Sequence, residues 1–115
     1  MPVLVISKKA DSSQMKEMMM SLGSYIKLAV DIEQGILAGG GKLHADCEGA
    51  LIEGGSKQEN VWGADWYPFP QKVTFESMIN IRPRLGKFSM ELEDPDLRRA
   101  IEKIARNLLE GVSYE

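Results

Sequence analysis

A chain of 115 residues with 43% hydrophobic and 27% charged residues has the length and composition of one folded globular domain. Its formal net charge of −3 and its pI near 5.2 argue against general nucleic-acid binding, because nucleic-acid-binding proteins usually present a basic face. We therefore treat residues 1–115 as a single domain without general affinity for nucleic acid.

Cysteine usage and hydropathy predict a cytoplasmic protein. The one cysteine, Cys47, cannot form an internal disulfide, whereas small secreted domains often contain several. The apolar run at residues 3–6 has no basic residues ahead of it, so we expect no signal peptide. No apolar stretch approaches the roughly 20 residues that span a bilayer, so we expect no membrane association. Nothing in the sequence indicates a cofactor.

Hydrophobic periodicity predicts three helices separated by strands. Residues 15, 18, 19 and 22 form an apolar stripe between capping residues at 11–13 and Gly23, which predicts the first helix. The second helix is expected over residues 43–53, and the third begins at Asp94-Pro95. Apolar runs or alternating residues predict strands at residues 3–6, 25–32, 36–38, 61–67, 73–82 and 88–92.

The order β-α-β-β-α-β-β-β-α lacks the regular alternation of a doubly wound fold. We therefore predict an α+β domain, with a largely antiparallel or mixed sheet and helices packed on it. The three glycines at 39–41 are expected to break a strand and form the turn into the second helix.

That glycine-rich turn is the first candidate binding site. Backbone N–H groups ahead of a helix can bind anions, so Gly40 and Gly41 are candidate ligand contacts. However, Ile36 and Leu43 stand where a nucleotide-binding phosphate loop requires glycine and Ser or Thr. We favour a strand-to-helix turn and keep an unspecialised anion pocket as the alternative.

The segment His44-Ala45-Asp46-Cys47-Glu48 contains the side chains best suited to catalysis or metal binding. A histidine beside carboxylates can act as a general base or a metal ligand, which makes His44, Asp46 and Glu48 candidate catalytic residues. On a helix only His44 and Glu48 share a face, and no HxxxH or CxxC spacing supports a metal site. The favoured interpretation is therefore a helix start whose acids complement the macrodipole. Cys47 falls on the buried stripe and is expected to be a core residue.

A second candidate cluster lies downstream. Asn80 and Arg82 share the polar face of the predicted strand, and Arg84 extends into the following turn, where guanidinium groups would suit a carboxylate or phosphate. Intramolecular ion pairs are the favoured alternative for these arginines. Trp62 and Trp66 lie on one face of their strand, so they complete a core or, if exposed, form a stacking platform.

Four pieces of the sequence, in this order, resemble a family of small prokaryotic proteins of unknown function. The resemblance implies no activity, cofactor or catalytic residue. It covers nearly the full length and rests on VDIEQGILAGGGKLHADCE, GGSKQENVWGADWYP, SMINIRP followed by LGKFSMELEDP, and the final arginine-rich helix.

Three functional hypotheses follow. The leading one is a small binding module for an anionic or polar ligand, or for a protein partner, whose surface includes Gly40, Gly41, Trp62, Asn80, Arg82 and Arg84. The second is a small hydrolase-like or metal-dependent enzyme that uses His44 with Asp46 or Glu48. The third is a structural subunit that forms a homodimer through a methionine patch or a sheet edge.

Overall fold

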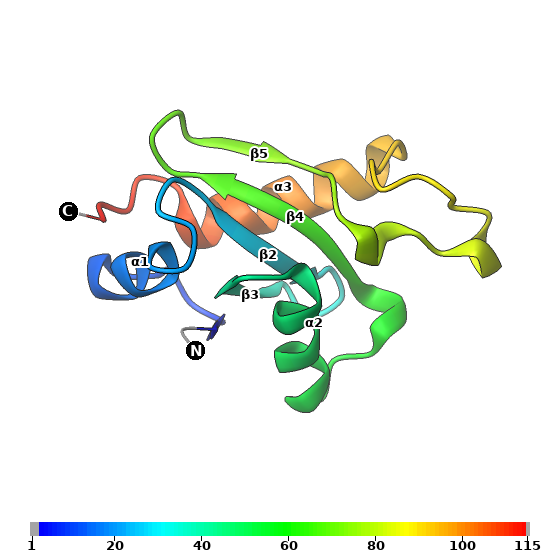
Figure 1. Ribbon diagram of the computed structural model, residues 1–115, viewed down its shortest axis with the longest axis horizontal. Coiled ribbons are helices and arrows are strands. Elements are labelled where there is room, and N and C mark those ends of the chain that lie inside the picture. The colour runs from blue at the N-terminus through cyan, green and yellow to red at the C-terminus, as the bar shows by residue number, and fades with distance from the viewer. Residues whose placement is uncertain (1–2, 115) are drawn as a thin grey trace.

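Five antiparallel strands form one sheet in the order β1-β3-β2-β4-β5, and three helices pack on it, as the computed structural model shows for residues 3–114 (Figure 1). The α+β class is confirmed, and the helices and strands follow the predicted order, except that residues 88–92 form no regular strand. The strands are β1 (Leu4–Ile6), β2 (Ile26–Asp31), β3 (Ile36–Gly41), β4 (Val61–Tyr67) and β5 (Lys72–Thr74). The helices are α1 (Ser12–Met19), α2 (His44–Glu53) and α3 (Pro95–Leu109).

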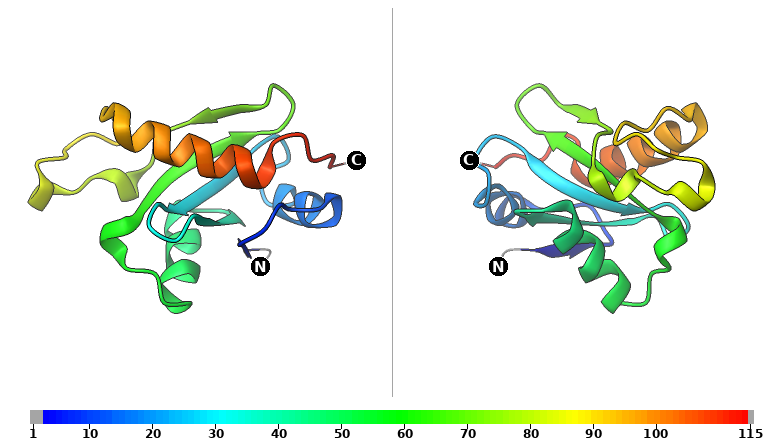
Figure 2. Two further views of the ribbon diagram at one scale, coloured as in Figure 1. Left: turned by 180° about the vertical axis from the view of Figure 1, so that it is seen from behind. Right: turned by 45° about the vertical axis from the view of Figure 1, so that its right-hand side comes forward.

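The helices divide between the two faces of the sheet. Helix α3 runs across one face, as the view from behind shows, and α2 lies on the other (Figure 2). Helices α1 and α3 share the larger core, where the predicted methionine stripe of α1 is buried together with both tryptophans. Helix α2 covers a smaller core built around Ala29, Ala38, Cys47, Leu51 and Val61. The second face is thus only partly covered, which leaves room for a site beside α2.

The glycines at 39–41 belong to β3 rather than to a turn, which corrects the sequence-based expectation. The pairing of β2 with β3 shifts at Gly40, which takes a positive φ of 101°. Such a bulge changes the direction of the chain and the face to which the next residue points. A Cβ at Gly39 would lie 3.0 Å from Met18 of α1, whereas a Cβ at Gly41 would lie 3.0 Å from Asp46 of α2. The glycines therefore allow close packing of a helix on each face.

Asp31 holds the end of β2 to the turn that follows and to the end of α2. Its side chain is fully buried, and its two carboxylate oxygens accept hydrogen bonds from the backbone N–H groups of Glu33 and Gln34 and from the side chains of Gln34 and Ser56. Burial alone would raise the pKa of Asp31, but the hydrogen bonds from Ser56 and from the turn outweigh it and lower the pKa below 3.8.

Replacement of Asp31 by asparagine is therefore expected to destabilise the protein in a pH-dependent manner. Because the folded pKa is the lower one, the ionised carboxylate stabilises the fold above the ordinary value and loses this effect as the pH falls through the folded pKa. We expect a loss of about 2–3 kcal/mol in the free energy of unfolding at pH 7. Urea unfolding of the wild type and of Asp31→Asn across the acid range measures this loss. A difference in unfolding free energy that stays constant with pH would contradict the role of the ionised Asp31 carboxylate.

The segment between β5 and α3, residues 75–94, is called the arm. The sequence predicted strands at 73–82 and 88–92, but β5 ends at Thr74 and the remainder forms 3₁₀ turns at Met78–Asn80 and Pro83–Leu85 with two isolated bridges. Phe75 and Leu92 anchor its base in the larger core, and the N–H of Leu92 donates to the carbonyl of Phe75 at 3.0 Å. Asn80 and Arg82 bond to the edge of β4, and the tip of the arm beyond them extends away from the sheet (yellow, at the right of Figure 1).

Candidate functional site

A row of polar side chains crosses the sheet on the face that carries α2. Lys27 of β2 lies opposite Asp65 of β4, and Asp65 lies opposite Thr74 of β5. Directly opposed residues on antiparallel strands point to the same face, so strand register alone brings these three side chains together. The Thr74 hydroxyl donates to Asp65 Oδ2 at 3.1 Å, which fixes one edge of the carboxylate.

His44, the first residue of α2, completes this row. Gly41 at the end of β3 lies opposite Lys27, and α2 begins three residues later, so the helix start falls beside Asp65. The distance from His44 Nε2 to Asp65 Oδ1 is 2.9 Å, and the distance to the carbonyl oxygen of Ala64 is 3.1 Å. The two side chains of the pair are only 12% and 9% exposed. The imidazole is therefore held by a shielded carboxylate.

These two contacts determine which ring nitrogen carries the proton. A carbonyl oxygen can only accept a hydrogen bond, so Nε2 must be the protonated nitrogen that donates to Ala64 and Asp65. In the neutral imidazole, Nδ1 then carries the lone pair. Nδ1 has no hydrogen-bond partner among the residues that the structure describes. Asp65 thus orients an imidazole whose second nitrogen is free to accept a hydrogen bond or a proton.

The imidazole lines an open cleft of about 280 Å³. The rings of Tyr25 and Tyr67 stack in parallel within it, with centroids 5.0 Å apart and planes inclined by 9°. Burial and the negative charge of Asp65 raise the pKa of Tyr67, so its phenol is protonated and can donate. The base of the arm forms the opposite wall. The lining residues are Tyr25, Lys27, His44, Asp65, Tyr67, Glu76, Ser77, Met78 and Met90.

Asn80 and Arg82, predicted as ligand contacts, cover the outer edge of β4 beyond the end of β5. The Asn80 amide is fully buried, accepts from the N–H of Gly63 at 2.8 Å and donates to its carbonyl at 3.0 Å. The Arg82 guanidinium donates to the carbonyls of Ile79, Gln58 and Val61 and stacks on Trp62, 4.1 Å from the ring centroid. These side chains satisfy backbone groups that a longer β5 would otherwise pair with.

The other predicted site residues lie outside the cleft. Asp46 Oδ2 accepts from the N–H of Leu43 at 3.3 Å and so caps α2, as the macrodipole interpretation expected. Glu48 lies 4.0 Å from the Arg82 guanidinium, while Arg84 is exposed on the arm. The remaining predicted contacts are buried in the fold: Gly40 and Gly41 in β3, and Trp62, 3% exposed, beneath Arg82. The structure therefore joins Glu48, Arg82 and Trp62, but none of the three lines the cleft with His44.

The orienting carboxylate, Asp65, was not among the sequence-based candidates. A lone acid within the otherwise apolar β4 requires a partner when buried, and His44 is the one histidine of the chain. That pairing is the signal that could have identified it. Choosing Asp65 over Asp46 or Glu48 requires the strand register, which periodicity does not provide.

Cys47 lies next to this site without taking part in its chemistry. The thiol is buried and donates to the carbonyl of Lys27 at 3.4 Å, and burial raises its pKa to about 11. Because the reactive species is the thiolate, we expect native Cys47 to react with Ellman's reagent at pH 8 at least about 100-fold more slowly than the urea-unfolded chain. Equal rates in the two states would show that the thiol is accessible.

Two further groups of observations bear on the class of protein. Within residues 3–114, no three or more His, Cys, Asp or Glu side chains converge in a way that could hold a metal ion. Over the same residues, no helix combines the length and apolar character needed to cross a membrane.

The fold and the cleft define a small α+β domain with a histidine–aspartate pair at the end of a helix. The chain belongs to a family described as a protein of unknown function, DUF5674, whose profile matches residues 4–108. The resemblance noted from the sequence, to a family of unknown function, is confirmed, while a prokaryotic origin stays a prediction. Searches of the curated proteins and of the solved structures give no significant match.

Proposed function

We propose that the protein is a small-molecule-binding module and that its ligand occupies the cleft beside α2, with His44 Nδ1 as the principal acceptor. The observation that carries this proposal is the pair of Nε2 contacts, to Asp65 at 2.9 Å and to Ala64 at 3.1 Å. They fix the ring orientation before any ligand arrives. A preorganised acceptor loses little conformational entropy on binding.

The charges of the cleft favour a neutral polar ligand over an anion. Lys27 is its one basic group at neutral His44, against the carboxylates of Asp65 and Glu76. Lys27 Nζ also donates to the carbonyl of Lys42 at 3.0 Å. The stacked tyrosines and the wall methionines add apolar surface. A compact amide or alcohol, with an N–H or O–H donor directed at His44 and a small apolar part, matches this lining.

Backbone amide NMR shifts on titration with small neutral amides and alcohols, and with matched carboxylates, test the proposal. We expect neutral donors to shift the signals of Tyr25, Lys27 and Tyr67 and to bind more tightly than the carboxylates. The variants His44→Ala and Asp65→Asn should weaken binding at least about tenfold. Glu53→Gln, at the exposed end of α2, is the matched control and should bind as the wild type does. Shifts that persist in His44→Ala, or shifts confined to other surfaces, would overturn the assignment.

The same geometry supports acid–base catalysis as a second candidate function. An imidazole oriented by a carboxylate can take a proton from a bound substrate or from water. The buried Cys47 thiol is not a suitable nucleophile, so a hydrolytic reaction here would use water activated by His44 Nδ1. Turnover of small ester and amide substrates that is lost in both His44→Ala and Asp65→Asn would establish this function, and binding without turnover would exclude it for those substrates.

We also propose that the protein is located in the cytoplasm. The buried, unpaired Cys47 suits a reducing compartment.

A further inference from the structure

The arm concentrates exposed apolar surface. Half of the large hydrophobic side chains that are exposed within residues 3–114 lie on this one segment, and Met78, Leu85 and Phe88 are 74%, 58% and 74% exposed. Neighbouring apolar side chains left in solvent typically mark an interaction surface. The arm projects from the sheet, so a partner could reach its tip without disturbing the core (Figure 1).

Charge is distributed unevenly along the arm. Residues 77–90 carry three basic side chains and no acidic one, whereas residues 91–94 carry three acidic side chains and no basic one. Internal contacts use several of these charges: Arg82 binds backbone carbonyls, Glu91 pairs with Arg98 at 2.7 Å, and Asp94 caps α3. Arg84 and Glu93 have neither a hydrogen-bond nor an ion-pair partner in the described part of the chain.

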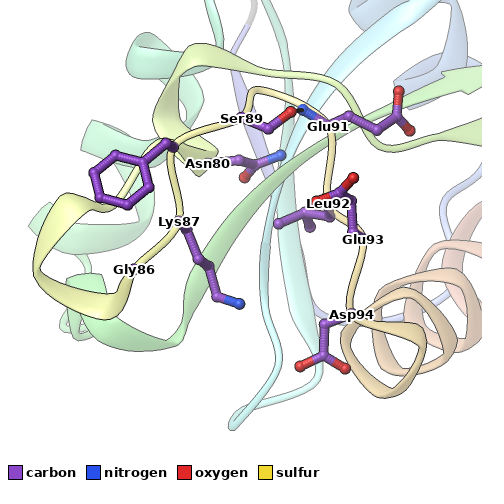
Figure 3. Close-up of a pocket in the computed structure, with 9 residues that line it drawn as sticks. Asn80, Gly86, Lys87, Ser89, Glu91, Leu92, Glu93 and Asp94 are labelled. Atoms are coloured by element: carbon purple, nitrogen blue, oxygen red, sulfur yellow. Dashed lines mark hydrogen bonds between the residues drawn. The ribbon is translucent and has the colours of Figure 1, made fainter.

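We call residues 77–90 the basic limb of the arm and residues 91–94 its acidic limb, and the two lie side by side in space. They face each other across a pocket of about 130 Å³, with Lys87 on one limb and Glu93 and Asp94 on the other (Figure 3). A surface with adjacent patches of opposite sign is complementary to its own copy when that copy is turned by a two-fold axis. The basic limb of one copy can then meet the acidic limb of the other, in both directions.

We propose that the arm is a homodimer interface, in which a second copy of this chain packs its Leu85 and Phe88 against those of the first. Arg84 of each copy pairs with Glu93 of the other. The net charge of −3 and the acidic limb disfavour the alternative occupant, an anionic membrane surface. None of Arg84, Leu85, Phe88 and Glu93 lines the cleft, so this inference goes beyond the proposed function and is tested separately.

Sedimentation equilibrium over a range of protein concentrations measures the association. The wild type should change from 12.8 kDa to twice that mass as the concentration rises. The double variant Leu85→Ser, Phe88→Ser should remain monomeric, while Phe69→Ser is the matched control, since Phe69 is 87% exposed outside the arm. Thermal unfolding at low concentration checks that the exposed substitutions leave the fold intact.

Charge reversal tests the pairing itself. Arg84→Glu and Glu93→Arg should each weaken the dimer at least about tenfold, and the combined variant should restore association, because the pairs re-form with exchanged sign. A mass of 12.8 kDa at all concentrations would overturn the proposal. A monomer that binds anionic phosphatidylserine vesicles would overturn it too, because a membrane surface would then be the partner of the arm. A dimer that is indifferent to these substitutions would overturn it equally.

Discussion

Replacement of Asn80 by alanine is expected to lower the free energy of unfolding by about 4 kcal/mol, because two buried backbone groups lose their partner at once. The amide accepts from the N–H of Gly63 and donates to the Gly63 carbonyl, with longer contacts to the carbonyls of Phe75 and Met90 at 3.4 and 3.3 Å. Water cannot replace these bonds readily, since Asn80 is fully buried. The substitution also leaves a small cavity, which adds to the loss.

Chemical denaturation of Asn80→Ala measures this effect, and Asn107→Ala provides the control. Asn107 is exposed on α3, so its loss should change stability by no more than about 0.5 kcal/mol. An Asn80→Ala protein as stable as this control would mean that the amide does not hold the edge of β4.

Replacement of Arg82 by alanine is expected to lower the free energy of unfolding by about 3 kcal/mol, the second large effect, because three backbone carbonyls lose their shared donor. The guanidinium also covers Trp62, which is only 3% exposed. Arg82→Lys should recover little, since an ammonium group cannot reproduce the planar fork that reaches the carbonyls of Ile79 and Gln58 together.

Arg84→Ala is the matched control for Arg82, two residues away on the same arm but exposed. At concentrations where the protein is monomeric, its unfolding should match that of the wild type. The result also separates the two interpretations of the Arg82 cluster. If Arg82 were primarily a ligand contact, its removal would weaken binding and leave the unfolding free energy unchanged.

Local signals were sufficient to predict most of the fold. The methionine stripe of α1, its N-terminal cap at Asp11 and the Asp94-Pro95 start of α3 each follow from short-range rules, and all three occur in the structure. The extent of β5 could not be predicted in this way. Alternation from Val73 to Arg82 suits a strand, but the Asn80 and Arg82 side chains pair with the edge of β4 instead. This competition between side chain and backbone depends on tertiary contacts.

The candidate site was only half predictable for a related reason. His44 stood out as the one histidine beside acids, yet its carboxylate comes from β4, 21 positions along the chain. The two nearer acids are used elsewhere, Asp46 in the helix cap and Glu48 beside Arg82. Sequence neighbours on a helix start are plausible partners, but the register of β2 with β4 decides which acid meets the imidazole.

The nitrogen NMR spectrum of the His44 imidazole tests the central claim most directly, since the chain has one histidine and only the two ring nitrogens have to be distinguished, by their couplings to the ring protons. We expect Nε2 to be protonated in the neutral ring and Nδ1 to be the free acceptor, with the Nδ1 resonance shifting when a neutral amide or alcohol binds. Asp65→Asn should weaken this preference, because the Ala64 carbonyl then remains as the one group that requires a proton on Nε2. A ring protonated at Nδ1, or an Nδ1 signal that no ligand moves, would contradict the assignment of this cleft as the binding site.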